Sequence, residues 1–86
     1  MKLCFTPSAW EDYQWFQEHD RKLVKRINQL IKDVLRSPFD GIGKPEPLKA
    51  ELSGYWSRRI NEEHRLIYTA TTTEIVIIAC RYHYSK

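Results

Sequence analysis

The sequence predicts an α+β fold with elements in the order β-α-α-β-β-β, in which an antiparallel sheet carries two N-terminal helices on one face. Three observations support this prediction. Residues 20–36 repeat apolar side chains at helical spacing, after a shorter aromatic stripe in residues 9–17. Residues 55–60, 65–70 and 74–84 are strand-like, and turn-forming residues separate them. The length of 86 residues leaves room for one domain, which we expect over residues 1–86.

The first strand and the first helix are predicted from local signals. Residues 2–6 alternate between polar and apolar side chains, as in a short strand. Thr6 followed by Pro7 is typical of a helix N-cap with proline at the first helical position. Glu11 and Asp12 then fall in the first turns, where the helix dipole favours acidic residues. We expect the aromatic stripe of this helix to be core rather than a ligand site.

The second helix is predicted over residues 20–36, with Asp20 as its cap and Ser37-Pro38 as its end. A short junction at His19-Asp20 predicts that the two helices form an αα-hairpin. The outer face of the second helix is basic: it carries Arg21, Lys22, Lys25, Arg26, Lys32 and Arg36. For any single lysine a solvated face is the better interpretation, whereas the set as a whole favours a polyanion contact.

The C-terminal half is predicted to supply a loop and most of the sheet. Residues 38–49 contain two glycines and three prolines, which is typical of a loop. Residues 55–60, 65–70 and 74–84 follow as three strands, and the near-continuous apolar centre of the last suits the middle of a sheet. We expect the first strand to add at an edge or beside the last strand.

Composition sets the broad class of the protein. The net charge of +3 and the pI near 9.0 permit nucleic-acid binding without requiring it. Cys4 and Cys80 lie in apolar runs and are expected to be buried and reduced in a cytoplasmic protein, although a disulfide stays open at this point. Their neighbours lack metal-ligand spacing, and no apolar stretch approaches the length of a membrane span or a signal sequence.

Basic residues are predicted to gather on the sheet face that the helices leave open. Period-two alternation groups Tyr55, Ser57 and Arg59 on one face of residues 55–60, and Arg65, Ile67 and Thr69 on one face of residues 65–70. Applied to the last strand, the same rule groups Ile77, Ala79, Arg81 and His83 on one face, and Ile78, Cys80, Tyr82 and Tyr84 on the other. We therefore expect arginines from two or three strands to converge with His83. Cations beside a titratable histidine and aromatic rings suit a phosphodiester substrate.

A carboxylate candidate lies in the proline-rich loop. Pro45 and Pro47 flank Glu46, stiffen the loop and bias Glu46 toward extended geometry. From the residues alone, an exposed and merely turn-forming glutamate is the more frequent case. His19 and His64 fall in turn-like positions and receive no functional role. Glu63 is expected in a hairpin turn, where pairing with a site arginine is one option.

Three separated motifs give the sequence a resemblance to a known family. They are "GKPEPLK" (43–49), "LSGYWSRRINEEHRLIY" (52–68) and "CRYHY" (80–84). Together they resemble the YoeB (Txe) family of bacterial toxins, within the RelE-like superfamily, essentially from end to end. The resemblance implies a RelE-like fold and a toxin of a type II toxin–antitoxin system. It also implies a ribosome-dependent mRNA endonuclease that cuts mRNA in the A site and so inhibits translation.

The same resemblance implies site residues and partners. It places the general base on Glu46, the general acid on His83, the phosphate-stabilising arginine on Arg65 and the terminal tyrosine on Tyr84. Positions expected to line the site are Lys49, Arg59, Glu63 and Arg81. The implied partners are a YefM-like antitoxin and the ribosome, with a homodimer as one option. The implied chemistry is 2′-hydroxyl attack without a metal or other cofactor. Read without the resemblance, the residues leave open which of Glu46 and His83 is the acid.

Two other functions are compatible with the residues. A ParE-like toxin that inhibits DNA gyrase without cutting anything has the same general fold, but it has no need of an acid–base pair. A non-catalytic RNA-binding module would use the basic helix and the aromatic strand face, and its binding would depend on salt.

Overall fold

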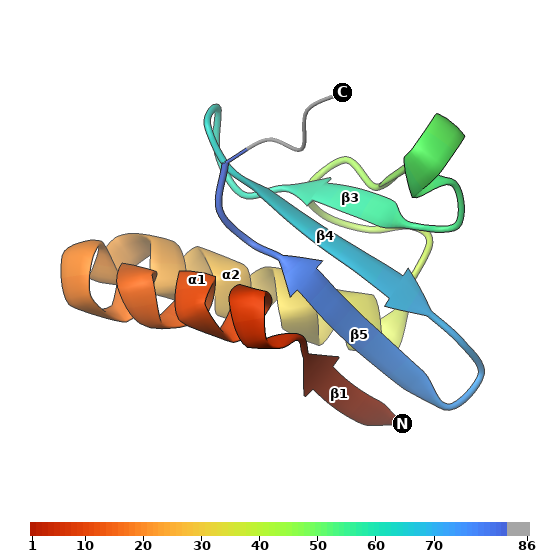
Figure 1. Ribbon diagram of the computed structural model, residues 1–86, viewed down its shortest axis with the longest axis horizontal. Helices are drawn as coiled ribbons and strands as arrows, with labels where there is room; N and C mark the ends of the chain where they lie inside the picture. The colour runs from red at the N-terminus through yellow and green to blue at the C-terminus, as the bar shows by residue number, and fades with distance from the viewer. Residues whose placement is uncertain (83–86) are drawn as a thin grey trace.

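Five strands form one sheet, and both helices cover the same face of it (Figure 1). The computed structural model describes residues 1–82. Its elements are β1 (Lys2–Phe5), α1 (Pro7–His19), α2 (Arg21–Arg36), β2 (Glu46–Pro47), the 3₁₀ helix η1 (Ala50–Leu52), β3 (Trp56–Arg59), β4 (Arg65–Ala70) and β5 (Glu74–Ala79). The predicted α+β class and element order are confirmed, with a two-residue strand, β2, added before β3. Within residues 1–82, neither helix is long and apolar enough to cross a membrane.

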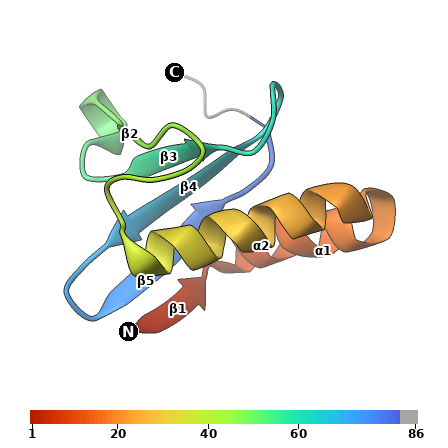
Figure 2. The same ribbon diagram turned by 180° about the vertical axis from the view of Figure 1, so that it is seen from behind.

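The sheet is mixed rather than wholly antiparallel. Its strand order is β1-β5-β4-β3-β2. Neighbouring strands from β2 to β5 pair antiparallel, as predicted, whereas β1 pairs parallel with β5. The first strand thus lies beside the last one, which was one of the two expected positions. The parallel pairing arises because the helical hairpin and the three following strands return the chain to the same end of the sheet before β5 begins (Figure 2).

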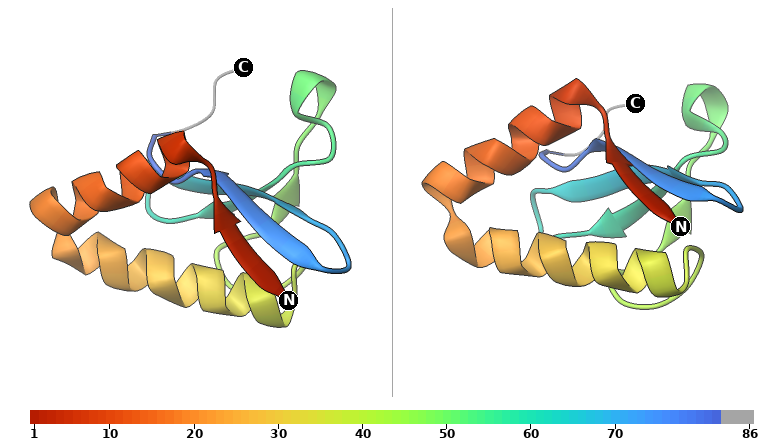
Figure 3. Two further views of the ribbon diagram at one scale, coloured as in Figure 1. Left: turned by 60° about the horizontal axis from the view of Figure 1, so that its bottom comes forward. Right: turned by 90° about the horizontal axis from the view of Figure 1, so that it is seen from below.

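The predicted capping residues fix the helix boundaries. The Thr6 hydroxyl accepts a hydrogen bond from the Ala9 N–H at 3.2 Å and begins α1. Asp20 serves both helices: its N–H donates to the Phe16 carbonyl at 2.8 Å, and its Oδ1 accepts from the Leu23 N–H at 3.3 Å. One residue therefore closes α1 and opens α2, which makes the tight helical hairpin seen in Figure 3.

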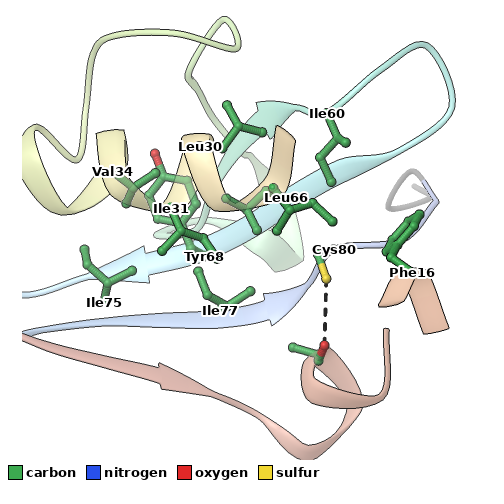
Figure 4. Packing of buried hydrophobic residues seen from close by; sticks show 12 residues of the cluster. Phe16, Leu30, Ile31, Val34, Ile60, Leu66, Tyr68, Ile75, Ile77 and Cys80 are labelled. Carbon is green, nitrogen blue, oxygen red and sulfur yellow. Dashed lines mark hydrogen bonds between the residues drawn. The ribbon is translucent and has the colours of Figure 1, made fainter. Parts of the chain in front are cut away.

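The core lies between the helices and the sheet (Figure 4). The periodic apolar residues of α2 that were predicted to face inward include Ile27, Leu30 and Val34, and all three are fully buried. They pack against side chains that share one face of β4 and β5, namely Leu66, Tyr68, Ile75 and Ile77. Each fully buried side chain of this size contributes about 1.5–3 kcal/mol, so this layer carries much of the stability.

The last strand departs from the predicted alternation. A register shift sets Ile67 opposite Ala79 but Tyr68 opposite Ile77, so Ile78 is an extra residue on β5. The strand ends at Ala79, and Cys80 then returns to the core beside Ile77. The expectation that Ile77 and Cys80 face opposite sides is therefore wrong, because the bulge inserts one residue between them.

Cys80 is held in that position by α1. Its N–H donates to Asp12 Oδ2 at 3.1 Å, and its Sγ donates to the Ala9 carbonyl at 3.7 Å (Figure 4). Burial, and secondarily the charge of Asp12, raises the pKa of the Cys80 thiol to about 12. Cys4 and Cys80 are both free thiols.

A fully buried arginine organises the loop that follows α2. The Arg58 side chain has no exposed surface. It donates to Asp33 Oδ2 at 2.7 Å, to the Tyr68 hydroxyl at 3.1 Å and to three backbone carbonyls, of Ser37, Asp40 and Ile42, at 2.7 to 3.1 Å. The loop over residues 37–42 is therefore fastened to β3, and the segment that leads to β2 starts from a fixed position.

Candidate active site

The open face of the sheet brings together residues from three adjacent strands. Glu46 of β2 pairs with Ser57 of β3, and Arg59 of β3 pairs with Arg65 of β4. Antiparallel partners point to the same face, and residues 57 and 59 share a face by alternation. Glu46, Arg59 and Arg65 therefore lie on one side of the sheet, opposite to the side that carries Arg58 and Tyr68.

The distance between Glu46 and Arg65 across the sheet suits a sugar–phosphate unit. Strands lie about 4.8 Å apart and advance about 3.4 Å per residue, so the Cα atoms of Glu46 and Arg65 are separated by roughly 12 Å. Two strand spacings and two residues along the strand account for this separation. A glutamate and an arginine side chain can both reach a sugar–phosphate unit placed between them.

Backbone bonds on both sides hold Glu46 at the edge of the sheet. Before it, the Gly43 carbonyl accepts from the Arg59 N–H at 2.6 Å, and after it the Leu48 N–H donates to the Tyr55 carbonyl at 2.9 Å. Leu48 is buried, whereas Glu46 is exposed. The extended geometry expected for Glu46 is confirmed by its place in β2. The carboxylate is thus presented to solvent from a fixed backbone.

Lys49 follows at the start of η1. It occupies the N-cap position of that short helix without a side-chain capping bond, and it is exposed. Within residues 1–82, neither Lys49 nor Arg59 has a side-chain hydrogen bond or ion pair to another residue. Both cationic groups remain available to a ligand.

Arg65 lies over the turn that precedes β4. Its Nη1 donates to the carbonyls of Asn61 at 2.6 Å, His64 at 3.0 Å and Glu62 at 3.4 Å. These bonds occupy only one of the guanidinium nitrogens and orient the group at the edge of the open face. The remaining N–H groups have no partner in the described part of the chain, so the group retains donors for phosphate oxygens.

Glu63 lies in the same turn, as predicted. Its carboxylate is 3.6 Å from His64 Nε2 and is largely exposed. No ion pair with an arginine is seen among residues 1–82, so the optional pairing of Glu63 with a site arginine is not formed in this structure.

The Arg81 side chain packs against α1. Its guanidinium carbon is 3.7 Å from the ring centre of Trp15 on α1 and 4.7 Å from that of Tyr82. Arg81 Nη2 also donates to the Tyr82 hydroxyl at 3.0 Å, while the buried Nε has no hydrogen-bond partner in the described region. The Arg81 guanidinium is thus directed toward α1 after the bulge in β5, and its contribution to the site stays a prediction.

His83 and Tyr84 lie outside the described residues. Tyr82, which directly precedes them, is bonded to the start of β4. Its N–H donates to His64 Nδ1 at 2.7 Å, and its carbonyl accepts from the Arg65 N–H at 3.1 Å. The chain therefore leaves the described structure next to Arg65.

Two residues matter to this arrangement in ways that sequence reasoning missed. His64 was assigned only a turn position, yet it is buried and bonded to Tyr82, the last described residue. No local signal reveals this, because its partner is 18 residues away. Arg58 did have a signal, since a charge between apolar neighbours on the helix-covered face requires a buried partner. In residues 1–82 no group of three or more His, Cys, Asp or Glu side chains has an arrangement suited to a metal ion.

Comparisons with known proteins show the family. Residues 5–84 match the model of the YoeB-like toxin of bacterial type II toxin–antitoxin systems. The toxin YoeB of Synechocystis sp. is 65% identical over 86 residues, which is 100% of both chains. A structure described as a YoeB/ParE toxin from Agrobacterium tumefaciens superposes with a TM-score of 0.95 at 49% identity, over 98% of this chain and 100% of that one.

The toxin of Staphylococcus aureus has been solved in two assemblies. As a YoeB dimer it superposes with a TM-score of 0.91, and in a heterotetrameric YoeB–YefM complex with 0.90. Both are 53% identical to this chain and cover 98% of each. The matched family model and these identities together show that the chain belongs to the YoeB toxin family of type II toxin–antitoxin systems, with a RelE-like fold.

Proposed function

We propose that the chain is an endoribonuclease that cuts mRNA in the A site of the ribosome and thereby inhibits translation. The observation that carries the proposal is the shared open face of Glu46, Arg59 and Arg65 on three adjacent strands. A carboxylate and two guanidinium groups on the sheet face opposite the helices match the charges that develop when a phosphodiester is cleaved. Membership of the toxin family supports the same conclusion.

The proposed reaction assigns one task to each group. Glu46 takes the proton of the ribose 2′-hydroxyl, whose oxygen then forms a bond to phosphorus. Arg65, with Arg59 beside it, stabilises the negative charge on the pentacoordinate phosphate. The bond from phosphorus to the 5′-oxygen breaks, and His83 supplies the proton that this oxygen takes up. Tyr84 offers a stacking surface for a base. The products are a 2′,3′-cyclic phosphate and a 5′-hydroxyl, and no metal takes part.

The ribosome has a specific part in this proposal. A carboxylate is a weak base toward a sugar hydroxyl, so Glu46 alone removes the proton slowly. The ribosome holds the mRNA in the geometry for in-line attack and contributes to activating the nucleophile. The free protein is therefore expected to cut naked RNA poorly. Robust cutting of naked RNA that His83→Gln abolishes would contradict this dependence on the ribosome.

The proposed protein partners are a YefM-like antitoxin and a second copy of the chain. The Staphylococcus aureus relative forms both types of assembly. In this chain, Leu3 and Trp10 are exposed by 41% and 46%. Trp10 forms a ring cluster with Phe5 and Tyr13, with centroids 5.7 Å apart, and Leu3 lines the same surface pocket. An exposed apolar patch of this kind favours a protein contact.

The proposal is tested by the chemistry of the cut ends. Programmed ribosomes are incubated with the protein, and both ends of each mRNA fragment are identified. A cyclic phosphate with a 5′-hydroxyl is expected, together with strong loss of cutting in Glu46→Ala, Arg65→Ala and His83→Gln. Full activity in all three variants would overturn the site assignment. Inhibition of gyrase supercoiling without any cut mRNA would overturn the reaction itself.

A further inference from the structure

Both backbone groups of Tyr82 are held by two consecutive residues at the start of β4. The Tyr82 N–H donates to His64 Nδ1 at 2.7 Å, and the Tyr82 carbonyl accepts from the Arg65 N–H at 3.1 Å. Tyr82 has φ of +63°, a left-handed conformation that residues other than glycine rarely adopt. Such a conformation persists only where neighbouring bonds determine it, which indicates that these two bonds fix the chain here.

The histidine in this clamp is itself fixed. His64 is only 5% exposed. Its ring meets Phe16 of α1 edge to face, with centroids 5.0 Å apart, and lies 5.4 Å from the ring of Tyr82. Because Nδ1 accepts a hydrogen bond from a backbone N–H, the imidazole is neutral and carries its proton on Nε2. The Asn61 side chain also accepts a hydrogen bond from the His64 backbone N–H at 2.7 Å, so the main chain of His64 is held as well.

From this geometry we propose that His64 is a positioning residue for the C-terminal end of the chain, which carries His83 and Tyr84. The inference rests on the proposed ribonuclease function and adds a residue to it. The role proposed for His64 is indirect and involves no bond to the reacting atoms. It acts through Tyr82, whose two backbone bonds fix the last described residue directly beside Arg65. Proton transfer depends steeply on geometry, so a shift of about 1 Å at this point can cost roughly a hundredfold in rate.

Three substitutions distinguish the role of Nδ1 as a hydrogen-bond acceptor from the role of the His64 ring in packing. His64→Phe keeps an aromatic ring against Phe16 and removes the acceptor. His64→Asn loses the ring, but its amide oxygen lies near the former position of Nδ1. His64→Gln carries the same amide one bond farther out, where it does not match Nδ1, and is the matched control for His64→Asn.

The first measurement is single-turnover mRNA cutting on programmed ribosomes, at a series of protein concentrations. We expect the maximal rate of His64→Phe and of His64→Gln to fall at least tenfold, with the half-saturating concentration within about twofold of wild type. His64→Asn is expected to retain a rate within about threefold of wild type. A purely structural role predicts instead that rate follows melting temperature in all three variants. If His64→Phe does not fold, the comparison of His64→Asn with His64→Gln decides.

The second measurement reads the clamp without activity. Amide hydrogen exchange at Tyr82, followed by NMR, is expected to be slow in wild type and His64→Asn and at least tenfold faster in His64→Phe. If the wild-type protein cuts ribosome-bound mRNA, and His64→Phe and His64→Gln cut it at the wild-type rate, the positioning role alone is overturned. A wild-type protein that cuts no ribosome-bound mRNA, while Tyr82 still shows this exchange pattern, would overturn the proposed function and leave the clamp as a structural contact only.

Discussion

Arg58 and Arg59 are consecutive residues of β3, yet their environments are opposite. Arg58 faces the helices, has no exposed surface and directs its donors to a carboxylate, a hydroxyl and three carbonyls. Arg59 faces the open side, and its guanidinium has no hydrogen-bond or ion-pair partner within residues 1–82. The comparison teaches that a guanidinium whose donors are all used by its own chain serves the fold, whereas one with free donors can serve a ligand.

The two arginines are nevertheless linked through the loop that carries Glu46. On the helix-covered face of the sheet, Arg58 donates hydrogen bonds that hold residues 37–42. The Arg59 N–H then holds the Gly43 carbonyl at 2.6 Å, three residues before Glu46. The buried side of β3 thus determines the position of a carboxylate on the exposed side.

The largest expected effect is that of Arg58→Met. This change removes the charge that Asp33 and three carbonyls require, and breaking a buried charge network from one side typically costs about 3–5 kcal/mol. The free energy of unfolding, measured by urea denaturation, should fall by about that amount. The matched variant Arg59→Met should stay within about 0.5 kcal/mol of wild type. Equal losses in the two variants would remove the distinction between the two sides of the strand.

Arg59→Ala should show the converse behaviour. We expect a roughly tenfold lower maximal rate of mRNA cutting, because one guanidinium near the developing phosphate charge is lost. The urea midpoint should be almost unchanged, since no side-chain bond within the described chain depends on Arg59. A stable variant that cuts mRNA at the wild-type rate would show that the Arg59 guanidinium does not contribute to cutting.

Asp33, the carboxylate partner of Arg58, should make the stability of the fold depend on pH. Hydrogen bonds from Arg36 first, then from Arg58 and the Ile42 N–H, hold the pKa of Asp33 well below its usual range. Since the folded pKa lies below the unfolded pKa, these bonds stabilise the protein above about pH 4, and that contribution is lost as the pH falls further. The urea midpoint of wild type should therefore drop more between pH 5 and pH 3 than that of Asp33→Asn. Parallel curves would contradict this account of the buried network.

The smallest expected effect concerns the two thiols. With its pKa raised to about 12 by burial, Cys80 on the covered side has almost no thiolate at pH 8. Cys4 lies on the edge strand β1 and is partly exposed. Iodoacetamide should modify Cys4 in the native protein and Cys80 only after unfolding, as read by peptide mass spectrometry. Rapid native labelling of Cys80 would show that the covered side opens easily.

The features that could be predicted from sequence are those set by local chemistry. Thr6, Asp20 and the Ser37-Pro38 pair mark the helix ends because capping and proline geometry act over a few residues. Simple alternation grouped the residues of β3 and of β4 correctly within each strand, because these two strands pair without interruption.

The features that could not be predicted depend on distant partners. The bulge in β5 follows from its register with β4, and it turned Arg81 toward Trp15 instead of the open face. The bond between His64 and Tyr82 likewise joins segments that no periodic pattern relates. At positions where composition and spacing left several options, the predicted site residues came from the resemblance to a toxin family.

The place of β5 in the sheet has a consequence for biosynthesis. This strand is made last among the strands, and it separates β1 from β4. Until it emerges, the first strand of the nascent chain has nothing to pair with, and a contact across some seventy residues must then form. A chain that stops before β5 therefore cannot join β1 to the rest of the sheet.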